Sequence, residues 1–590
     1  MRVRTLPLVL ALGLAIPAGA VPAALEPLDR LVEHGVISRD ELARLDLSRP
    51  ARAPEIAAWM KRAFEGHAEA VLGGAGLAAP RPDGILTRAD ALDRISDLRF
   101  PTLRVIETTD VHGYMLPGAH EPGTRRPLGG SAALAAWIHR LRDENPDGTI
   151  LVDGGDWFQG TMISNLQFGR PIVDQMNQLG YAAAAIGNHE FDWGLDTLAR
   201  RISELRFAAL GANCVEKQTG RRPGFARADT IVTRRGVRVA LLGLCYRETP
   251  TVTLAVNVAT LRFEDDSTTA ARLVPELRQR DSAQVVVVIG HIPAGSNRDE
   301  RALSGDLPRL ARGIRGVDAW LGGHSHNRVL DTIEGAPVLI AGAHAEMVGV
   351  VDLVFDRLRG RVVEHRARLL PTYSDSLPPD SATAARVARW NTAVAPIANQ
   401  PVGRAARRLG RGSPNAIGDL VTDAMREAGG AEIALTNGGG LRADLVAGVI
   451  TRGEIYEVMP FDNTIVTLVM SPRELRRAFE EGLRSGRVLA VSGLRVTYDP
   501  SRPPFQRLVE LRRGNGAPLD ENRDYKIAIN NFIATGGDNY ESFRNGRALH
   551  DTSVPVRDAI EAFVRARCAG GGAIDYGSER RVIRVGSSQR

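Results

Sequence analysis

The chain has 590 residues, of which 44% are hydrophobic and 24% charged, the balance of an ordinary globular protein. Its net charge of +6 comes almost entirely from arginine spread along the sequence, which argues against the clustered basic surface of a nucleic-acid-binding protein. The length exceeds what one hydrophobic core can serve, and the three cysteines (Cys214, Cys245 and Cys568) exclude a disulfide scaffold while leaving room for one disulfide.

The N-terminus has the pattern of a secretory signal peptide over residues 1–20. Two arginines precede an apolar stretch from Leu6 to Ile16, and a small-residue cleavage site ends at Ala20. We therefore expect export across the inner membrane, to the periplasm or the cell surface. No later segment has the roughly 20 unbroken apolar residues of a transmembrane helix, so no membrane span is expected.

Residues 24–98 carry three stretches of helical apolar spacing, with Asp or Thr near the expected helix starts. The pattern predicts small helical hairpins. The motifs "HGVI" and "GILTRADAL" faintly resemble a surface-layer-homology module, which binds cell-wall polymer. That resemblance implies contact with the cell wall through 24–98, and a plain helical prodomain or spacer is the alternative.

From residue 101 the pattern changes to short apolar runs that alternate with helical ones, which predicts an α/β domain over 101–370. The runs are nearly continuous in apolar residues, as expected for strands buried on both faces. They are "TLRVIETTD", "TILVDGGD", "AAAAIGNHE", "VRVALLGLC", "QVVVVIGH", "DAWLGGHSH" and "PVLIAGAH".

A Pro/Ser-rich loop and one helical pattern that ends near Pro396 occupy residues 371–400, which we interpret as an interdomain linker. A second α/β region follows over 401–586, with strands expected in "EIALTNGG", "TIVTLVM" and "DYKIAINNFIA". The predicted fold is thus α/β, with two domains joined by a linker helix and preceded by a small helical segment.

Side chains that can bind a metal follow five of the predicted strands. Asp110 and His112 are two residues apart in "TTDVHG", and alternation along a strand would point both to the same side. Open α/β sheets place ligand sites beyond the carboxyl ends of their strands, so we expect the whole set to converge on one metal site. Each motif alone is usually structural, and their joint occurrence carries the prediction. The other members are Asp156, Asn188, His189, His291, His324 and His326.

The motifs D-x-H, G-D, G-N-H-E, G-H and G-H-x-H, in this order, resemble those of the calcineurin-like metallophosphoesterases. Residues 101–586 as a whole are similar to the secreted 5'-nucleotidase branch, through "IETTDVHG", "GNHEFDWG", "GGHSH", "NGGGLR" and "ATGGDNY". The resemblance implies a calcineurin-like metallophosphoesterase sandwich followed by a nucleotide-binding domain. It also implies metal-dependent hydrolysis of nucleotide phosphate esters outside the cytoplasm.

The same resemblance implies two divalent metal ions, for which Zn, Mn, Fe and Co all suit imidazole and carboxylate ligands. A hydroxide held by both ions would attack phosphorus in line. By the matching motifs, one ion would be held by Asp110, His112 and His326, the other by Asn188, His291 and His324, with Asp156 bridging the two.

His189 and Asp192 resemble the catalytic dyad of the family. In such a dyad the carboxylate orients the imidazole, which stabilises the transition state or donates a proton to the leaving group. The alternative for Asp192 is the N-cap of the helix that follows it. Glu190, between the two, is expected to be structural.

The second α/β region matches the family's substrate pocket. Arg442 can bind phosphate bidentately beside three glycines. Phe461 and Phe532 match the two aromatic residues that sandwich a nucleobase, although without the resemblance both would be interpreted as core residues. The remaining matches are Asn437, the ribose-binding acid Asp538 and, where the local sequence departs from the usual pattern, a further phosphate-binding arginine at Arg411.

The resulting hypothesis is a 5'-nucleotidase that acts on small-molecule nucleotides, with the linker as a hinge that brings the substrate to the metals. One alternative is a 2',3'-cyclic-nucleotide 2'-phosphodiesterase or UDP-sugar hydrolase, which the metal motifs do not separate from the first. A second alternative is a cell-wall-attached binding protein that uses residues 24–98. The nucleoside-pocket matches argue against the thiosulfohydrolase branch of the superfamily.

Overall fold

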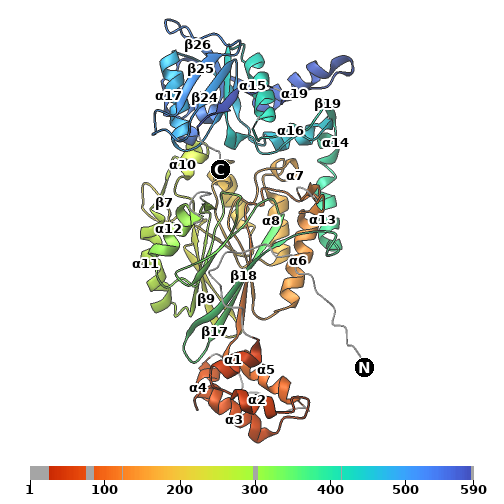
Figure 1. Ribbon diagram of the computed structural model, residues 1–590, viewed down its shortest axis with the longest axis vertical. Helices are drawn as coiled ribbons and strands as arrows, with labels where there is room; N and C mark the ends of the chain where they lie inside the picture. Colours follow the sequence, from red (N-terminus) through yellow and green to blue (C-terminus); the bar gives the residue numbers. More distant parts are fainter. Residues whose placement is uncertain are drawn as a thin grey trace, which may run out of the picture.

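The computed structural model describes residues 26–74, 86–121, 124–296, 303–413, 415–577 and 579–586. The expected signal peptide, residues 1–20, lies outside these residues. Three parts are stacked along the long axis of the molecule, with the helical N-terminal segment at one end and the C-terminal α/β domain at the other (Figure 1). Within the described residues, every helix is too short or too polar to cross a membrane.

The N-terminal segment is helical, as its sequence predicts. Its helices are α1 (Pro27–Glu33), α2 (Arg39–Arg44), α3 (Ala53–Ala63), α4 (Ala68–Gly74) and α5 (Arg88–Arg99). Thr87 caps α5 by accepting from the backbone N–H of Asp90, whose carboxylate accepts from Thr87 in return. Trp59 and Phe64 belong to its small core, which also includes Val354 of the central domain.

The central domain is a sandwich of two six-stranded sheets. The strands of the first sheet, in order, are β18 (Arg361–Pro371), β17 (Met347–Asp356), β1 (Thr102–Thr108), β4 (Thr149–Asp153), β5 (Ala183–Ala185) and β6 (Ala208–Leu210). Those of the second are β15 (Arg328–Ile333), β16 (Ala336–Ala341), β14 (Ala319–Leu321), β11 (Val285–Gly290), β9 (Val237–Leu244) and β8 (Asp229–Arg234).

Alternate residues of each strand separate the layers of this sandwich. Ile150 and Val152 of β4 face the core between the sheets, whereas Leu151 faces outward. The outer core of the first sheet is completed by α6 (Ser131–Asp143), α8 (Arg170–Leu179) and α9 (Gly194–Ser203), and that of the second by α11 (Asp266–Gln279) and α12 (Asp306–Gly313). Because β1, β4, β5 and β6 are parallel, as are β9, β11, β14 and β16, their carboxyl ends gather at one edge.

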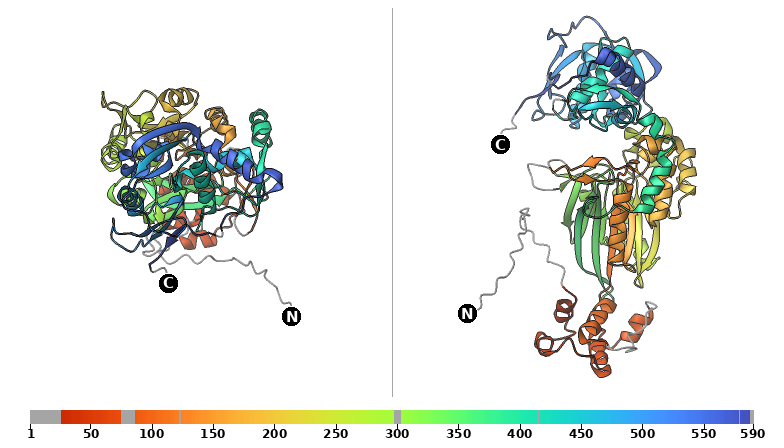
Figure 2. Two further views of the ribbon diagram at one scale, coloured as in Figure 1. Left: turned by 90° about the horizontal axis from the view of Figure 1, so that it is seen from above. Right: turned by 90° about the vertical axis from the view of Figure 1, so that its right-hand side faces the viewer.

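The linker runs along one side of the sandwich to the C-terminal domain (Figure 2). The sequence predicted one helix ending near Pro396, and this is wrong: α13 (Ser381–Asn391) ends earlier, and Pro396 opens a separate short helix, α14 (Ala395–Ala398). The reason is that proline is accommodated in the first turn of a helix, where its missing N–H is not needed, and not in the interior.

The C-terminal domain is built on a five-stranded sheet, in the order β23 (Leu489–Ser492), β20 (Ile433–Asn437), β26 (Tyr525–Asn530), β22 (Thr464–Met470) and β27 (Arg547–Pro555). One face packs against α15 (Ala416–Ala428) and α19 (Val556–Cys568), the other against α17 (Pro472–Arg484). All ten apolar runs predicted as strands form strands. Cys214, Cys245 and Cys568, which all lie in described parts of the chain, are free thiols.

Candidate active site

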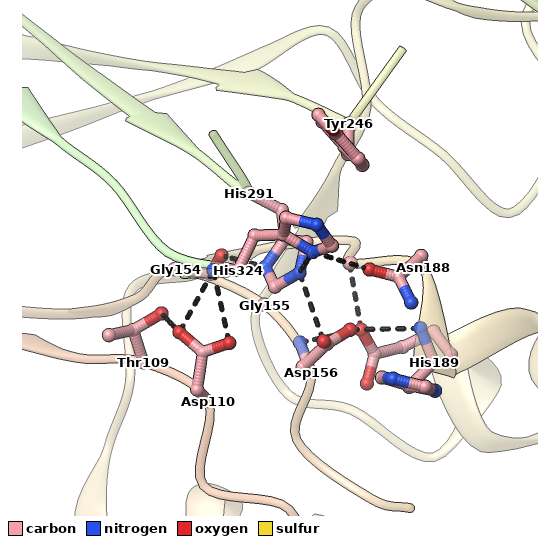
Figure 3. A network of polar contacts seen from close by, with 12 residues as sticks. Thr109, Asp110, Gly154, Gly155, Asp156, Asn188, His189, Tyr246, His291 and His324 are labelled. Atoms are coloured by element: carbon pink, nitrogen blue, oxygen red, sulfur yellow. Dashed lines mark hydrogen bonds and ion pairs between the residues drawn. The ribbon is translucent and has the colours of Figure 1, made fainter. Parts of the chain in front are cut away.

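The seven predicted metal-binding residues meet at the edge where the parallel strands of both sheets end. Asp110 and His112 follow β1, Asp156 follows β4, and Asn188 follows β5 in the first sheet. The second sheet contributes His291 after β11, and His324 and His326 after β14. The convergence predicted from the sequence is therefore present, with ligands from both layers (Figure 3).

One detail of that prediction is wrong. Asp110 and His112 do not alternate along a strand: both lie beyond β1 with φ of 50°. Their backbone N–H groups donate to the carbonyls of Gly155 and Asp156, at 2.9 and 3.0 Å. Asp156, His324 and His326 also have positive φ, at 59°, 68° and 55°. Left-handed backbone in tight loops, held by neighbouring loops, therefore brings these side chains together.

The residues form two groups that could each hold a metal ion. In each group one ligand atom per residue lies within 4.8 Å of the others. Asp156 connects the groups, because its Oδ2 lies 3.0 Å from His291 Nε2 and 3.7 Å from His112 Nε2. Asn188 Oδ1 lies 2.9 Å from His324 Nδ1, on the side of the second group. The first group is Asp110, His112 and His326, and the second is Asp156, His291 and His324.

Burial and mutual charge set the protonation of this cluster. Burial raises the pKa of Asp110 to about 7, and lowers the pKa of His112, His324 and His326 well below the usual range, which leaves these rings neutral, the form that binds metals. Burial also disfavours the charged form of His291, but the Asp156 carboxylate outweighs it and raises the pKa of His291 to about 10. Metal binding must therefore displace a proton from His291.

Backbone carbonyls orient two of the rings. His112 Nδ1 lies 2.7 Å from the carbonyl oxygen of Gln159, and His291 Nδ1 lies 3.0 Å from that of Gly154. When Nδ1 carries the proton toward a carbonyl, Nε2 is left with its lone pair for a metal ion. The chemistry and orientation of these donors thus fit divalent Zn, Mn, Fe or Co.

Glu190 holds the loops beneath this cluster. Its carboxylate accepts from the backbone N–H groups of Gly187, Asp156 and Trp157, at 2.7, 2.8 and 2.7 Å. The side chain is fully buried, and burial raises its pKa to about 8. These contacts tie the segment after β4 to the segment after β5, which is the structural role expected from the sequence.

His189 and Asp192 form a hydrogen-bonded pair next to the cluster. His189 Nδ1 lies 2.7 Å from Asp192 Oδ2. Burial disfavours the charged imidazole, but the carboxylates of Asp192 and Asp156 outweigh it and raise the pKa of His189. Trp193, rather than Asp192, is the N-cap residue of α9, so the helix-cap alternative for Asp192 is wrong.

A cavity of about 450 Å³ joins this pair to the C-terminal domain. The guanidinium Nη2 of Arg442 lies 3.2 Å from Nε2 of both His112 and His326. The Phe461 ring stacks on the His189 ring at 5.4 Å. Farther along the wall, Asn437 Nδ2 donates to Asp538 Oδ2 at 2.7 Å. Five of the six predicted substrate residues line this cavity: Asn437, Arg442, Phe461, Phe532 and Asp538.

Arg411, the sixth, lies elsewhere. It lines a neighbouring cavity of about 480 Å³ that shares Arg442 with the first. Its Nε pairs with Asp444 at 3.0 Å, and its Nη1 donates to the carbonyl oxygen of Arg442 at 2.7 Å. In this arrangement Arg411 supports the segment that carries Arg442 and does not face the larger group of predicted substrate residues.

Sequence reasoning missed the segment that follows β9. Val252, Thr253 and Leu254 line the cavity, and the Tyr246 ring lies 4.1 Å from the His324 ring (Figure 3). Arg487, from the loop before β23, also lines the cavity and donates to the carbonyl of Asp538 at 3.1 Å. A signal was present for the β9 segment, because "VRVALLGLC" is a parallel strand whose carboxyl end must reach the same edge.

Comparisons with known proteins match both domains. Residues 103–328 match the calcineurin-like phosphoesterase family, and residues 393–545 match the 5'-nucleotidase C-terminal domain. The 5'-nucleotidase of Diplobatis ommata is 26% identical over 78% of this chain and 87% of its own length. The snake venom 5'-nucleotidase of Naja atra is 27% identical over 76% of this chain and 93% of its own length.

Other relatives differ in length or only share the fold. The endonuclease YhcR of Bacillus subtilis is 27% identical over 73% of this chain, which spans 37% of that protein. Sulfate thiohydrolase SoxB of Thermus thermophilus is 20% identical with a TM-score of 0.69, covers 83% of this chain and 97% of its own, and shows the fold alone.

A solved structure of higher identity covers the two domains together. The 5'-nucleotidase precursor of Thermus thermophilus is 29% identical, with a TM-score of 0.74, over 82% of this chain and all of its own. The two family matches, this structure and the paired metal-binding groups agree with one another. The chain belongs to the metallophosphoesterases of the 5'-nucleotidase type, hydrolases with a two-metal site that combine a calcineurin-like phosphoesterase domain with a 5'-nucleotidase C-terminal domain.

Proposed function

We propose that this enzyme hydrolyses nucleoside 5'-phosphates outside the cytoplasm. The observation that supports the proposal best is a single cavity that runs from His189 and the metal-binding groups to Phe461, Phe532 and Asp538. Its volume of about 450 Å³ is in the range of small-molecule sites. The export pattern at residues 1–20 and the 5'-nucleotidases among the relatives support the substrate and the location.

The C-terminal domain would bind the nucleoside. Phe461 and Phe532 would stack on the base, a contact that accepts any base because each has a π face. Asp538 and Asn437, already hydrogen-bonded to each other, would accept from and donate to the ribose hydroxyls. Arg442, next to His112 and His326, would hold the phosphate at the metal-binding groups.

The metal-binding groups and the dyad would carry the chemistry. Two divalent ions, when bound, neutralise the charge of a phosphate ester and lower the pKa of a water molecule, so that displacement at phosphorus can proceed in line. Asp110, His112, His326 and Asn188, His291, His324 would hold them, with Asp156 shared. His189, with Nδ1 turned to Asp192, would present Nε2 to the leaving oxygen and hand it a proton.

A phosphate-release panel tests this function. Full-length enzyme would be supplied in turn with Mn, Zn and Co and assayed on AMP, ATP, UDP-glucose and 2',3'-cyclic AMP. We expect the highest kcat/KM on AMP. Cleavage of 2',3'-cyclic AMP to 3'-AMP, or of UDP-glucose to UMP and glucose 1-phosphate, releases no inorganic phosphate and would be followed by chromatography. A higher kcat/KM for either reaction would favour those alternatives, and inactivity on every 5'-nucleotide would contradict the proposal.

The cell-wall alternative concerns residues 24–98, whose described parts, 26–74 and 86–98, lie at the end of the sandwich opposite the C-terminal domain (Figure 1). Attachment through this segment would leave the cavity accessible, so the two functions are compatible. Sedimentation with purified cell walls, with and without residues 24–98, measures it. Equal sedimentation of both proteins would contradict a cell-wall role for the segment.

A further inference from the structure

The segment after β9 contacts the catalytic pair directly. It contains α10 (Thr249–Val252), Thr253 and η2 (Ala255–Val258). Thr253 Oγ1 donates to Asp192 Oδ1 at 2.8 Å, and Asn257 Nδ2 donates to the backbone carbonyl of Asp192 at 2.8 Å. Asp192 therefore uses Oδ2 for His189 and Oδ1 for Thr253, so both carboxylate oxygens have a partner.

The hydrogen bond from Thr253 restricts the rotation of the Asp192 carboxylate. The Thr253 side chain is buried, with 3% of the residue exposed, at the wall of the cavity. An aspartate held at one oxygen can rotate about its last side-chain bond, because that torsion is broad. A second donor on the other oxygen fixes the carboxylate plane, and with it the direction in which the His189 ring points.

The same segment also meets the other domain. α10 lies against η4 (Gly537–Asn539), which carries Asp538. Val252 and Leu254, on either side of Thr253, line the cavity. The C-terminal domain therefore contacts α10, and a nucleoside in the cavity would contact Val252 and Leu254, the two neighbours of Thr253 in the chain.

We propose that Thr253 is a positioning residue for the His189–Asp192 pair, held in a segment that also contacts η4 of the C-terminal domain. The inference rests on the proposed function for the identity of the substrate. The hydrogen bonds on which it is built belong to the structure itself and are measurable without turnover.

The chain offers a matched control. Thr251 lies two residues earlier on α10, and its Oγ1 donates to the carbonyl of Glu248 at 2.9 Å, within its own turn. Replacing either threonine by valine removes one hydroxyl at nearly constant shape. Only the change at position 253 removes a hydrogen bond to Asp192.

The experiment compares Thr253→Val, Thr253→Ser and Thr251→Val in the full-length zinc-loaded enzyme. For Thr253→Val we expect kcat on AMP to fall about 5- to 20-fold with KM changed less than about twofold, from the loss of one hydrogen bond to a charged group. On p-nitrophenyl phosphate, whose leaving group needs no proton, the loss should be less than about twofold. Thr253→Ser should restore most of the rate, and Thr251→Val should match the parent.

A second readout does not depend on turnover. The His189 Nδ1 proton shared with Asp192 should give a downfield proton NMR signal, assigned by its loss in His189→Ala, and Thr253→Val should shift or broaden it while Thr251→Val leaves it in place. An unchanged signal in Thr253→Val, or an equal loss of rate in Thr251→Val, would overturn the inference. An enzyme inactive on AMP would contradict the proposed function, yet the NMR comparison would still be decisive for Thr253.

Discussion

The two ends of the central sandwich both bury carboxylates, but they compensate the charge differently. At the end next to the helical segment, Asp356 is fully buried and pairs with Arg99, with Nε–Oδ1 at 2.7 Å and Nη2–Oδ2 at 2.9 Å. At the other end, Asp110 and Asp156 are equally buried and face histidines. The guanidinium of Arg99 is always charged, so it neutralises Asp356 permanently and joins the helical segment to the sandwich. The histidines can be neutral, so the carboxylates beside them are left for a bound cation to neutralise.

The partners of these carboxylates set the direction of each pKa shift. Burial disfavours the charged form of Asp356, but Arg99 and the backbone N–H groups of Arg359 and Leu358 together outweigh it and hold the pKa of Asp356 below its usual value. Burial raises the pKa of Asp110 to about 7, with His291 too weak an opposing influence to restore its usual value. Burial also disfavours the charged form of Asp156, but His291, His189 and His112 outweigh it and hold the pKa of Asp156 well below its usual value. Histidine partners, which a metal ion can share, therefore distinguish the ligand site better than the direction of the carboxylate pKa shift.

The substitution with the largest expected effect at the metal-binding end is Asp156→Ala. This side chain contacts both metal-binding groups, so its loss should remove activity to the level of chelated enzyme, a fall of at least about 10⁴-fold. Metal content measured on the same sample should fall as well. Full activity, or activity that survives chelation in the parent enzyme, would contradict a two-metal site.

The adjacent residues Asn188 and His189 separate metal binding from proton transfer. His189→Ala should keep both ions and KM while kcat on AMP falls by between about 10² and 10⁴, the range for a lost general acid. Asn188→Ala should instead weaken metal affinity about tenfold or more. Metal analysis beside kcat on AMP and p-nitrophenyl phosphate distinguishes them. Loss of an ion in His189→Ala would make our assignment wrong.

At the end of the sandwich next to the helical segment, a substitution should lower stability and leave activity unchanged. Asp356→Ala leaves Arg99 buried without its partner, so the free energy of unfolding should fall by about 3–5 kcal/mol while kcat stays near the parent value. Asp375→Ala is the control, because its pair with Arg126 is exposed and its loss should change the free energy of unfolding little. Urea unfolding measures the free energy of unfolding, and an AMP assay on the folded variants measures kcat. A large loss of kcat in folded Asp356→Ala would contradict a purely structural role for this ion pair.

The smallest expected effect concerns specificity. Replacing Phe461 or Phe532 by Ala should raise KM for AMP about tenfold, since one stacking contact contributes about 1–3 kcal/mol. Hydrolysis of p-nitrophenyl phosphate should change little. Steady-state kinetics on both substrates decide the matter, and equal losses on the two would identify these phenylalanines as core residues.

Much of the fold and of the metal cluster was readable from the sequence, because it rests on local patterns. Apolar runs such as "QVVVVIGH" become strands, and polar residues directly after them must reach one edge. The rest depends on contacts between distant segments. Thr253 meets Asp192 across 61 residues of chain, and Arg411 is held by Asp444, so no spacing indicates either arrangement.

The left-handed backbone at five of the seven predicted ligand positions also limits which substitutions the site tolerates. Asp, Asn and His are among the non-glycine residues that adopt this conformation most often, whereas β-branched residues strongly avoid it. A library that randomises Asp110, His112, Asp156, His324 and His326 should therefore recover Gly and Asn among its folded members and lack Val and Ile. The residue types suited to metal binding coincide here with those suited to the loops, so one choice satisfies two requirements.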